Sequence, residues 1–251
     1  MYRRRHLRIL WFFALTLLNI LWWDIFLTRL GLGKWGQESR TQRMRKISAS
    51  YRVLAVEMGG VLIKMGQFLS SRMDVLPPEI TEELSGLQDE VAPESFENIR
   101  KVIEAEFGEK LEMRFTEFEE TPLASASIGQ VHCARMCAVT GEVLEQTQPV
   151  VVKVQRPDIS RIVAVDLSAL RIVARWVEWY KPIRKRVNIN ALLDEFARSL
   201  YEEIDYINEG KNAETFAENF DAFQDVGVPR IFWSHTTRRV LTLEDVRAIK
   251  I

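Results

Sequence analysis

The segment "PVVVKVQRP", residues 149–157, places one lysine in the middle of an apolar run. Its β-branched valines and the proline at each end predict a short buried strand with Lys153 at its centre. Burying an ammonium group is costly unless a carboxylate or hydrogen-bond acceptors meet it. The strand therefore raises the question of which group Lys153 faces.

The composition indicates an ordinary globular chain. With 251 residues, 47% hydrophobic and 27% charged, the chain is long enough for one or two domains with a real core. Its formal net charge of −1 argues against general nucleic-acid binding, so no nucleic acid is expected among the partners. Two cysteines in this length indicate a reducing compartment without a disulfide framework.

Both cysteines lie in "HCARMC", where His132, Cys133 and Cys137 could be considered as metal ligands. On an extended strand the two cysteines are about 13 Å apart, at roughly 3.3 Å per residue. That separation is too long for one zinc ion with thiolate bonds of about 2.3 Å. We expect ordinary strand packing here and no metal site.

The N-terminal segment differs from the rest of the chain. A basic start, "MYRRRHLR", precedes the apolar run "ILWFFALTLLNILWW", residues 9–23. Tryptophans at the end of the run suit a bilayer interface, and the arginines favour a cytoplasmic start. We predict that residues 1–35 associate with the cytoplasmic side of a membrane, either spanning it or lying at its interface. The alternative is an apolar helix packed on the protein's own core.

A helical region follows. The apolar spacing from Leu54 to Leu69 has the 3.6-residue period of a continuous helix, and the prolines at 77 and 78 end that helix. Within it, "KMGQ" places Lys64 and Gln67 three residues apart on one face, which by itself is also typical of a solvated stripe. Residues 94–107 predict a second helix with a glycine C-cap at 108.

The stretch "TPLASASIGQVHCARM", residues 121–136, predicts a strand end, a tight turn at 124–129 and a second strand. Backbone N–H groups of such a turn can converge on one anion, and serine hydroxyls can add donors. The sequence is neither a Walker motif nor GxGxxG, so a phosphate cradle and an ordinary turn both stay open. A hairpin followed by a strand with a central lysine nevertheless resembles the front of a kinase nucleotide site.

In such a site the lysine pairs with a carboxylate from a helix. Residues 190–220 predict one long helix, and Glu203 lies at the edge of its apolar face, three and four residues from Leu200 and Ile207. Glu203 is therefore the predicted partner of Lys153. Asp205, two residues further on, projects in another direction.

Four segments in this order, "KMGQ", "PLASASIGQVH", "VVKVQRP" and "EEIDYINEGKNAETF", resemble the UbiB/AarF family of atypical protein-kinase-like proteins over about residues 45–251. The resemblance implies an α+β fold. A helical extension, residues 36–120, would precede a kinase-like small lobe, residues 121–251, built from an antiparallel sheet and long helices. The chain would end at the hinge, with the large lobe absent.

The resemblance also implies roles for single residues. Lys153 is the nucleotide-binding lysine, and Glu203 and Asp205 are the ExD element of the catalytic site. The family's KxGQ motif, which folds over the active site, corresponds to Lys64, Gly66 and Gln67. Nucleotide contacts are expected from the alanine-rich loop, here Ala124, Ser125, Ala126 and Ser127, and from Glu244 near the hinge. The implied cofactors are ATP or ADP with Mg²⁺.

The sequence contains no HxD, HPGN or DFG motif, and in the family these lie beyond the position of Ile251. We therefore expect the N-terminal part of a kinase or ATPase, a nucleotide-binding half-site linked to quinone or lipid metabolism. Membrane lipid or proteins of the quinone pathway are the expected partners, and no ATP turnover by these residues alone is expected. The alternative is a non-catalytic, membrane-associated binding or regulatory module.

Overall fold

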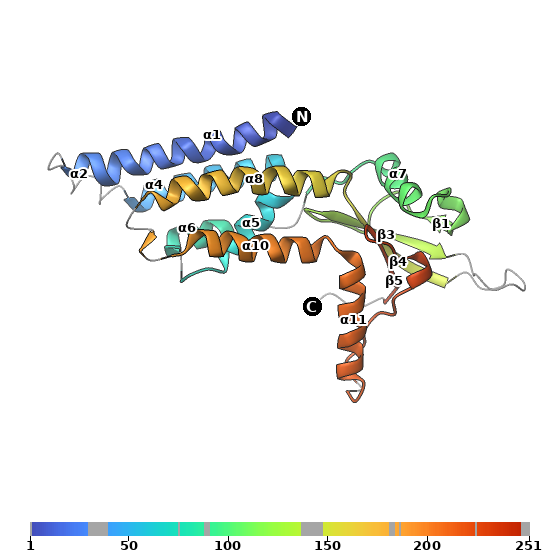
Figure 1. Cartoon of the computed structure of the whole chain (residues 1–251). Coiled ribbons are helices and arrows are strands. Elements are labelled where there is room, and N and C mark those ends of the chain that lie inside the picture. The colour runs from blue at the N-terminus through green and yellow to red at the C-terminus, as the bar shows by residue number, and fades with distance from the viewer. Residues whose placement is uncertain are drawn as a thin grey trace, which may run out of the picture. The chain divides into compact units, whose positions relative to one another are not determined.

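The computed structural model describes residues 2–29, 40–74, 76–87, 91–136, 148–180, 184–185, 187–223 and 225–246. The fold is α+β, as predicted, and the chain divides into two compact units (Figure 1). The helical unit comprises residues 1–89 and 160–200, and the sheet unit comprises residues 90–159 and 201–251.

The helical unit contains helices from two separate segments of the chain, residues 1–89 and residues 160–200. They are α1 (Tyr2–Leu21), the π-helical η1 (Trp22–Phe26), α2 (Leu27–Arg29), α4 (Arg40–Met58), α5 (Val61–Ser70), α6 (Pro78–Ser85), most of α8 (Ile159–Glu178) and the first part of α10 (Ile189–Glu203). Helix α6 begins at the second of the two prolines, where a missing N–H costs nothing.

The continuous helix predicted between residues 54 and 69 is interrupted. Gly59 and Gly60 have φ values of 63° and 60°, which only glycine adopts readily, and they separate α4 from α5. Across this break the buried Tyr51 hydroxyl donates to the carbonyl of Leu62 at 2.6 Å. The apolar period continued through the break, so periodicity alone did not reveal it.

The sheet unit is built on an antiparallel sheet with strand order β1-β3-β4-β5, and β2 pairs with β3. Its strands are β1 (Phe115–Phe118), β2 (Ala124–Ser125), β3 (Gly129–Met136), β4 (Gln148–Gln155) and β5 (Val240–Glu244). Its helical elements are α7 (Phe96–Phe107), α11 (Tyr206–Phe220) and the 3₁₀ turns η2 (Leu111–Met113) and η3 (Trp233–His235). The predicted hairpin around residues 124–129 is confirmed, as is the C-cap at Gly108, where φ is 71°.

The two faces of the sheet have different partners. Alternate valines of β4, Val150, Val152 and Val154, pack with α7 in the main apolar core. On the other face Leu241 of β5 packs with Tyr206 of α11. Because paired residues of antiparallel strands project to one face, Lys153, whose register partner is Leu241, lies on the α11 face.

The prediction of a buried strand is therefore wrong in one respect. Strand β4 is buried on the α7 face, whereas on the other face Val151 and Lys153 are only partly buried, and the side chain of Lys153 is 27% exposed. An antiparallel sheet commonly has one face against the core and one less covered. The valine at position 151 is likewise half-buried, so the unbroken valine run concealed the alternation.

The single helix predicted for residues 190–220 is also wrong. Helix α10 ends at Glu203, and α11 begins at Tyr206. Between them Asp205 has extended φ and ψ values of −107° and 91°, and its carboxylate accepts the N–H of Asn208 at 3.3 Å. An aspartate that caps the following turn offers the backbone an alternative to continuing the helix.

Candidate functional site

Lys153 meets a carboxylate on α11. Its Nζ lies 2.7 and 2.8 Å from the two carboxylate oxygens of Glu209, and 4.8 Å from the centre of the Tyr206 ring. The predicted partner, Glu203, is thus replaced by Glu209. The helix break explains the difference, because it starts a new helix whose first turn carries Glu209.

The small-residue turn lies in register with this lysine. Ala124 pairs with Val131, Val131 pairs with Lys153, and Lys153 pairs with Leu241, so one row of residues crosses β2, β3, β4 and β5. Cross-strand partners lie within about 5.5 Å of each other at their Cβ atoms. The side chains of Ala124 and Lys153 therefore project from the same face of the sheet, and the turn begins directly after Ser125.

Arg156 makes hydrogen bonds to the turn. Its guanidinium donates to the Ala126 carbonyl at 3.0 Å, to the Ser125 hydroxyl oxygen at 3.0 Å and to the Ala92 carbonyl at 2.7 Å, and it pairs with Glu94 at 3.3 Å. The side chain of Arg156 is only 12% exposed. The guanidinium thus ties the first residues of the turn, Ser125 and Ala126, to the segment that precedes α7.

The two serines of the turn have different surroundings. Ser127 is fully buried, and the Ala126 N–H donates to the Gly129 carbonyl at 2.8 Å to close the turn. Ser125 is half-buried and its oxygen accepts from Arg156. A hydroxyl that accepts one hydrogen bond still has its own proton to donate. Ser125 can therefore serve as a donor to an anion, whereas the burial of Ser127 suits a structural role.

Gly129 and Tyr206 make the closest approach in this region. A Cβ on Gly129 would lie 2.5 Å from the Tyr206 hydroxyl and 2.8 Å from the Val154 carbonyl oxygen. Burial raises the pKa of the Tyr206 phenol well above its ordinary range, and the carboxylates of Glu209 and Glu203 raise it further. The phenol is therefore neutral. Within the described residues its hydroxyl has no hydrogen-bond partner.

Gln155 joins the end of β4 to the helix break. Its side-chain amide donates to the carbonyls of Ile204 at 2.5 Å and Arg238 at 3.1 Å, and the Tyr206 N–H donates to the same Arg238 carbonyl at 3.3 Å. Because Gln155 is buried, these bonds fix the place where α11 starts. They thereby position Glu209 and Asp205 relative to Lys153.

The other predicted site residues fall at separate places. Glu244 ends β5, where its carboxylate accepts the Arg230 N–H at 3.2 Å. Lys64, Gly66 and Gln67 lie on α5 of the helical unit.

Within that unit the KxGQ segment has a clear packing role. A Cβ on Gly66 would lie 2.2 Å from the Leu87 side chain, and the Gln67 amide donates to the Leu87 carbonyl at 3.2 Å. The absence of a side chain at Gly66 leaves room for the Leu87 side chain, and the glutamine holds the backbone of the same leucine.

His132 and Cys133 behave as strand residues. The buried His132 ring contacts the Glu119 carbonyl at 2.7 Å and the Gln130 amide at 2.8 Å, and burial lowers the pKa of this histidine. Cys137 lies outside the described residues. Within the described ranges no group of three His, Cys, Asp or Glu side chains lies close enough to hold a metal ion.

Sequence reasoning missed four residues that shape the site: Gln155, Arg156, Tyr206 and Glu209. Two of them, Gln155 and Arg156, follow Lys153 closely in the opening segment. Long polar side chains at the end of a valine-rich strand are a signal that hydrogen-bond partners lie nearby. Glu209 and Tyr206 could be assigned only by recognising Asp205 as an N-cap, since the cap sets which carboxylate lies in the first turn of α11.

Comparison with known proteins gives one family. Residues 86–251 match the family described as the ABC1 atypical kinase-like domain. The Arabidopsis thaliana protein ACTIVITY OF BC1 COMPLEX KINASE 7, chloroplastic, is 38% identical over 220 residues, covering 88% of this chain and 30% of that protein. The probable protein kinase UbiB of Xylella fastidiosa is 37% identical over 213 residues, covering 85% of this chain and 36% of that protein.

An uncharacterized protein of Synechocystis sp. is 37% identical over 247 residues, covering 96% of this chain and 40% of that protein. The chain thus spans two fifths or less of the length of these three relatives. Among solved structures, that of Mycobacterium tuberculosis Rv3197 with erythromycin has a TM-score of 0.50 at 24% identity, covering 88% of this chain and 52% of that one. This last likeness concerns the fold.

Proposed function

Because the chain belongs to the ABC1 atypical kinase-like family, we propose that its sheet unit binds the phosphates of ATP or ADP. The observation that carries the proposal is the Lys153–Glu209 pair, whose lysine lies in one cross-strand row with Ala124, two residues before the turn at 126–128. A partly exposed ammonium held by a carboxylate is fixed in direction and still reachable by an anion. Ser125 and the backbone of the turn add neutral donors.

The chemistry of these donors fits a polyphosphate. Lysine supplies a positive point charge, and a turn of small residues lets a phosphate approach the backbone closely. For Mg²⁺, Asp205 is a candidate ligand, but the described residues contain no group of three His, Cys, Asp or Glu side chains that could hold a metal, and this ion prefers several oxygen ligands in octahedral geometry. When bound, the metal would neutralise phosphate charge. Lys153, Ser125 and the turn would bind the nucleotide equally in its ground and transition states, which gives affinity but little acceleration of phosphoryl transfer.

In the whole protein we infer an ATP-dependent kinase or ATPase role, with ATP or ADP and Mg²⁺ as cofactors. The names of the relatives, a probable protein kinase and a complex kinase, support this class. The resemblance to the UbiB/AarF family supports a link to quinone or lipid metabolism. A membrane-associated location at the cytoplasmic side is part of the same proposal, supported by the helical stretch Tyr2–Phe26, in which 18 consecutive residues have a mean hydropathy of 1.8.

The direct test is calorimetric titration of the chain with ATP, ADP, AMP and adenosine. We expect ATP and ADP to bind about tenfold or more tightly than AMP, because Lys153 faces phosphates beyond the first. Lys153→Met should remove this preference for the longer phosphate chains. Equal affinities for all four ligands, or a Lys153→Met variant that still prefers ATP, would contradict the proposal and favour a module with another ligand.

A further inference from the structure

Helix α1 is tied to the helical unit at its first turns. The Arg5 guanidinium donates to both carboxylate oxygens of Asp166 on α8, at 2.7 and 2.6 Å. It also donates to the carbonyls of Met58 at 2.6 Å and Gly59 at 3.2 Å, at the end of α4. Asp166 is fully buried, so separating Arg5 from it would leave a charge without its partner inside the unit.

The middle and far end of the α1–η1 stretch are tied to the same unit. The rings of Phe12 and Phe13 lie 6.0 and 6.2 Å from that of Tyr51 on α4. At the far end, Asp24 of η1 pairs with Arg43 of α4 at 2.8 Å, and both side chains are less than 20% exposed. The apolar stretch therefore lies along α4 for its whole length.

This contact bears on how the stretch could meet a membrane. The first turns of α4, "RTQRMRK", residues 40–46, contain the basic residues Arg40, Arg43, Arg45 and Lys46. If Tyr2–Phe26 crossed the bilayer while packed on α4 and α8, the basic first turns of α4 or the Arg5–Asp166 pair would move toward the hydrocarbon region. Charged side chains at that depth are strongly unfavourable. The packing of α1 thus opposes insertion across the bilayer.

The face of α1 and η1 that points away from the unit is apolar. Its members recur every three or four residues and are 46–67% exposed: Leu7, Trp11, Leu15, Leu18, Trp22 and Phe26. A helix that is apolar on its outer face as well as its packed face is typical of contact with lipid. We call these six residues the apolar stripe.

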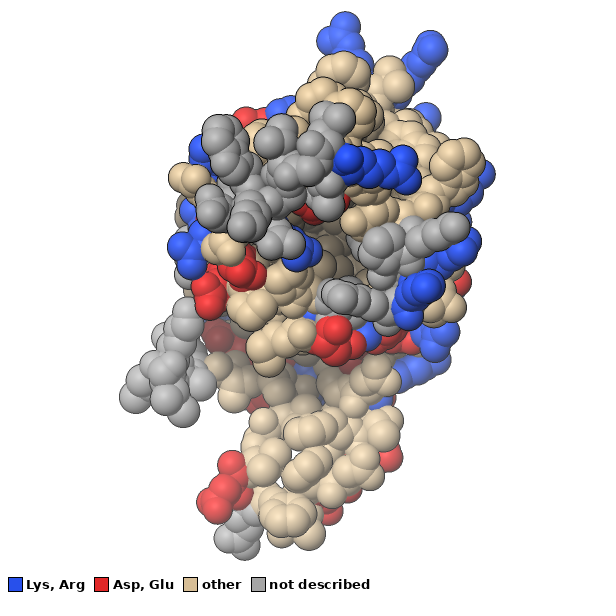
Figure 2. Space-filling model, turned by 90° about the vertical axis from the view of Figure 1, so that its left-hand side faces the viewer, with Lys and Arg blue, Asp and Glu red and all other residues tan. Residues whose placement is uncertain are grey.

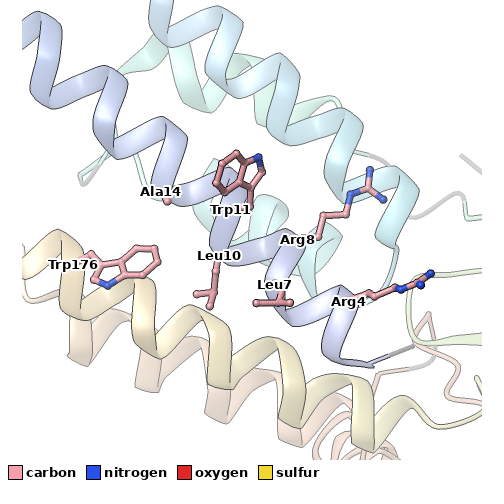
Figure 3. A pocket seen from close by; sticks show the side chains of 7 residues that line it. All are labelled: Arg4, Leu7, Arg8, Leu10, Trp11, Ala14 and Trp176. Atoms are coloured by element: carbon pink, nitrogen blue, oxygen red, sulfur yellow. The ribbon is translucent and has the colours of Figure 1, made fainter.

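A groove widens this surface toward α8. It has a volume of about 560 Å³ and is lined by Leu7, Leu10, Trp11, Ala14 and Trp176, with Arg4 and Arg8 at one end. In Figure 3, Leu7 and Leu10 point from α1 toward α8, while Trp176 points from α8 toward α1. Just past the end of α8, Trp179 is 92% exposed. Tryptophans at the edge of an apolar surface suit the level of lipid headgroups.

Basic side chains flank the apolar stripe. Arg3 and Arg4 are exposed on the first turn of α1, and Arg8 contacts Glu57 of α4. Figure 2 keeps α1 at the top of the view, where uncharged side chains (tan) lie beside Lys and Arg side chains (blue). Positive charge beside an apolar stripe complements a surface of anionic phospholipids.

We propose that the apolar stripe and its groove dock in the plane of an anionic bilayer surface, with α1 still packed on α4 and α8. The stripe enters the boundary between headgroups and acyl chains, the groove accepts acyl-chain carbons, and Arg3 and Arg4 contact lipid phosphates. The inference rests on the proposed membrane association and specifies its mode and its lipid. It does not depend on nucleotide binding by the sheet unit.

The test measures binding of the full chain to vesicles of phosphatidylcholine alone and of phosphatidylcholine with phosphatidylglycerol. We expect tighter binding to the anionic vesicles. Arg3→Gln with Arg4→Gln should lower this affinity about fivefold per arginine. Trp11→Asn with Leu18→Asn should lower it at least about tenfold. Met113→Asn is the matched control, because Met113 is as exposed as Trp11, 67%, and lies in the sheet unit.

Extraction of the vesicle-bound wild-type chain separates the possible outcomes. Release by alkaline carbonate, together with weakened binding of both double variants and unchanged binding of Met113→Asn, would support in-plane docking. Retention after carbonate treatment would contradict in-plane docking, because a spanning helix resists this treatment. The broader proposal of membrane association would stand. Absence of binding to either vesicle would overturn both in-plane docking and membrane association, while the result of the nucleotide titration would be unaffected.

Discussion

At the level of single residues, Glu209 controls the direction of the Lys153 ammonium, because both carboxylate oxygens lie within 2.8 Å of Nζ. Glu209→Gln keeps the shape of this side chain and removes its charge. Hydrogen bonds to charged groups contribute about 1.5–3 kcal/mol, so we expect ATP affinity to fall at least about tenfold in a calorimetric titration.

Two matched variants sharpen this prediction. Glu218→Gln changes an exposed carboxylate on the same helix and should leave ATP affinity unchanged. Glu203→Gln changes the carboxylate that sequence reasoning assigned to Lys153 and should have a smaller effect than Glu209→Gln. A larger loss for Glu203→Gln would show that the Glu209 contact is not the one that orients the lysine.

Gly129 gives a second prediction at this scale. In Gly129→Ala the new methyl group would meet the Tyr206 hydroxyl at 2.5 Å and the Val154 carbonyl at 2.8 Å, and the backbone carbonyl cannot easily move. Overpacking of this kind costs about 1–3 kcal/mol. Denaturant unfolding should show that loss of stability, while Gly227→Ala, with open space around the new Cβ, should not. Equal stability of the two variants would contradict the close approach.

At the level of elements, the turn between β2 and β3 depends on Arg156. Arg156→Lys keeps the charge but cannot reproduce the fork that reaches Ala126, Ser125 and Ala92 together. We expect a stability loss of about 1–3 kcal/mol and weaker ATP binding, because the acceptors on the turn lose their donors. Denaturant unfolding and the ATP titration measure the two effects.

The control for Arg156→Lys is Arg135→Lys. Arg135 on β3 pairs with Glu117 at 3.2 Å, and its side chain is 46% exposed. An exposed pair contributes about 0–1 kcal/mol, so this variant should resemble the wild type. If both variants behave alike, Arg156 does not hold the turn.

The same elements show what the sequence could and could not predict. The valine run and the small residues at 124–129 predicted the hairpin correctly, because strand propensity and turn chemistry are local properties. The glycine break after α4 and the capping break at Asp205 were missed, since apolar periodicity continued through both. A capped break is decided by backbone hydrogen bonds that include distant partners, such as the Arg238 carbonyl.

The missed break also explains the error at the site. On one continuous helix Glu203 was the best placed carboxylate, and Glu209 would have been almost two turns away from it. Ending α10 at Glu203 and restarting at Tyr206 brings the first turn of α11 to Lys153. The lysine itself was correctly predicted to meet a carboxylate from a helix. The identity of that carboxylate required the three-dimensional path of the chain.

At the level of the whole molecule, two buried histidines give the sheet unit a pH dependence. Burial lowers the pKa of His132 and His235, so the unfolded chain takes up their protons first as the pH falls. The contribution of these neutral histidines to the free energy of unfolding is therefore fully present above the unfolded histidine pKa of about 6.5. It is lost as the pH falls below that value.

We therefore expect unfolding by denaturant to become easier between about pH 7 and pH 5.5, by at most about 1.4 kcal/mol per pH unit for each histidine. His132→Gln or His235→Gln should reduce this slope. His6→Gln, a change in α1 of the helical unit, should leave the slope of the sheet unit as it is. A slope that is unchanged in both sheet-unit variants would contradict the assignment to these two side chains.

The central claim is that the phosphates of a nucleotide reach the Lys153 ammonium. Its most direct measurement is the rate of amine modification of each lysine, read by mass spectrometry with and without saturating ATP. Lys101 on α7, whose side chain is 66% exposed, is the internal control. We expect ATP to slow modification of Lys153 about fivefold or more and to leave Lys101 unchanged. Modification of Lys153 at the same rate with and without bound ATP would contradict it.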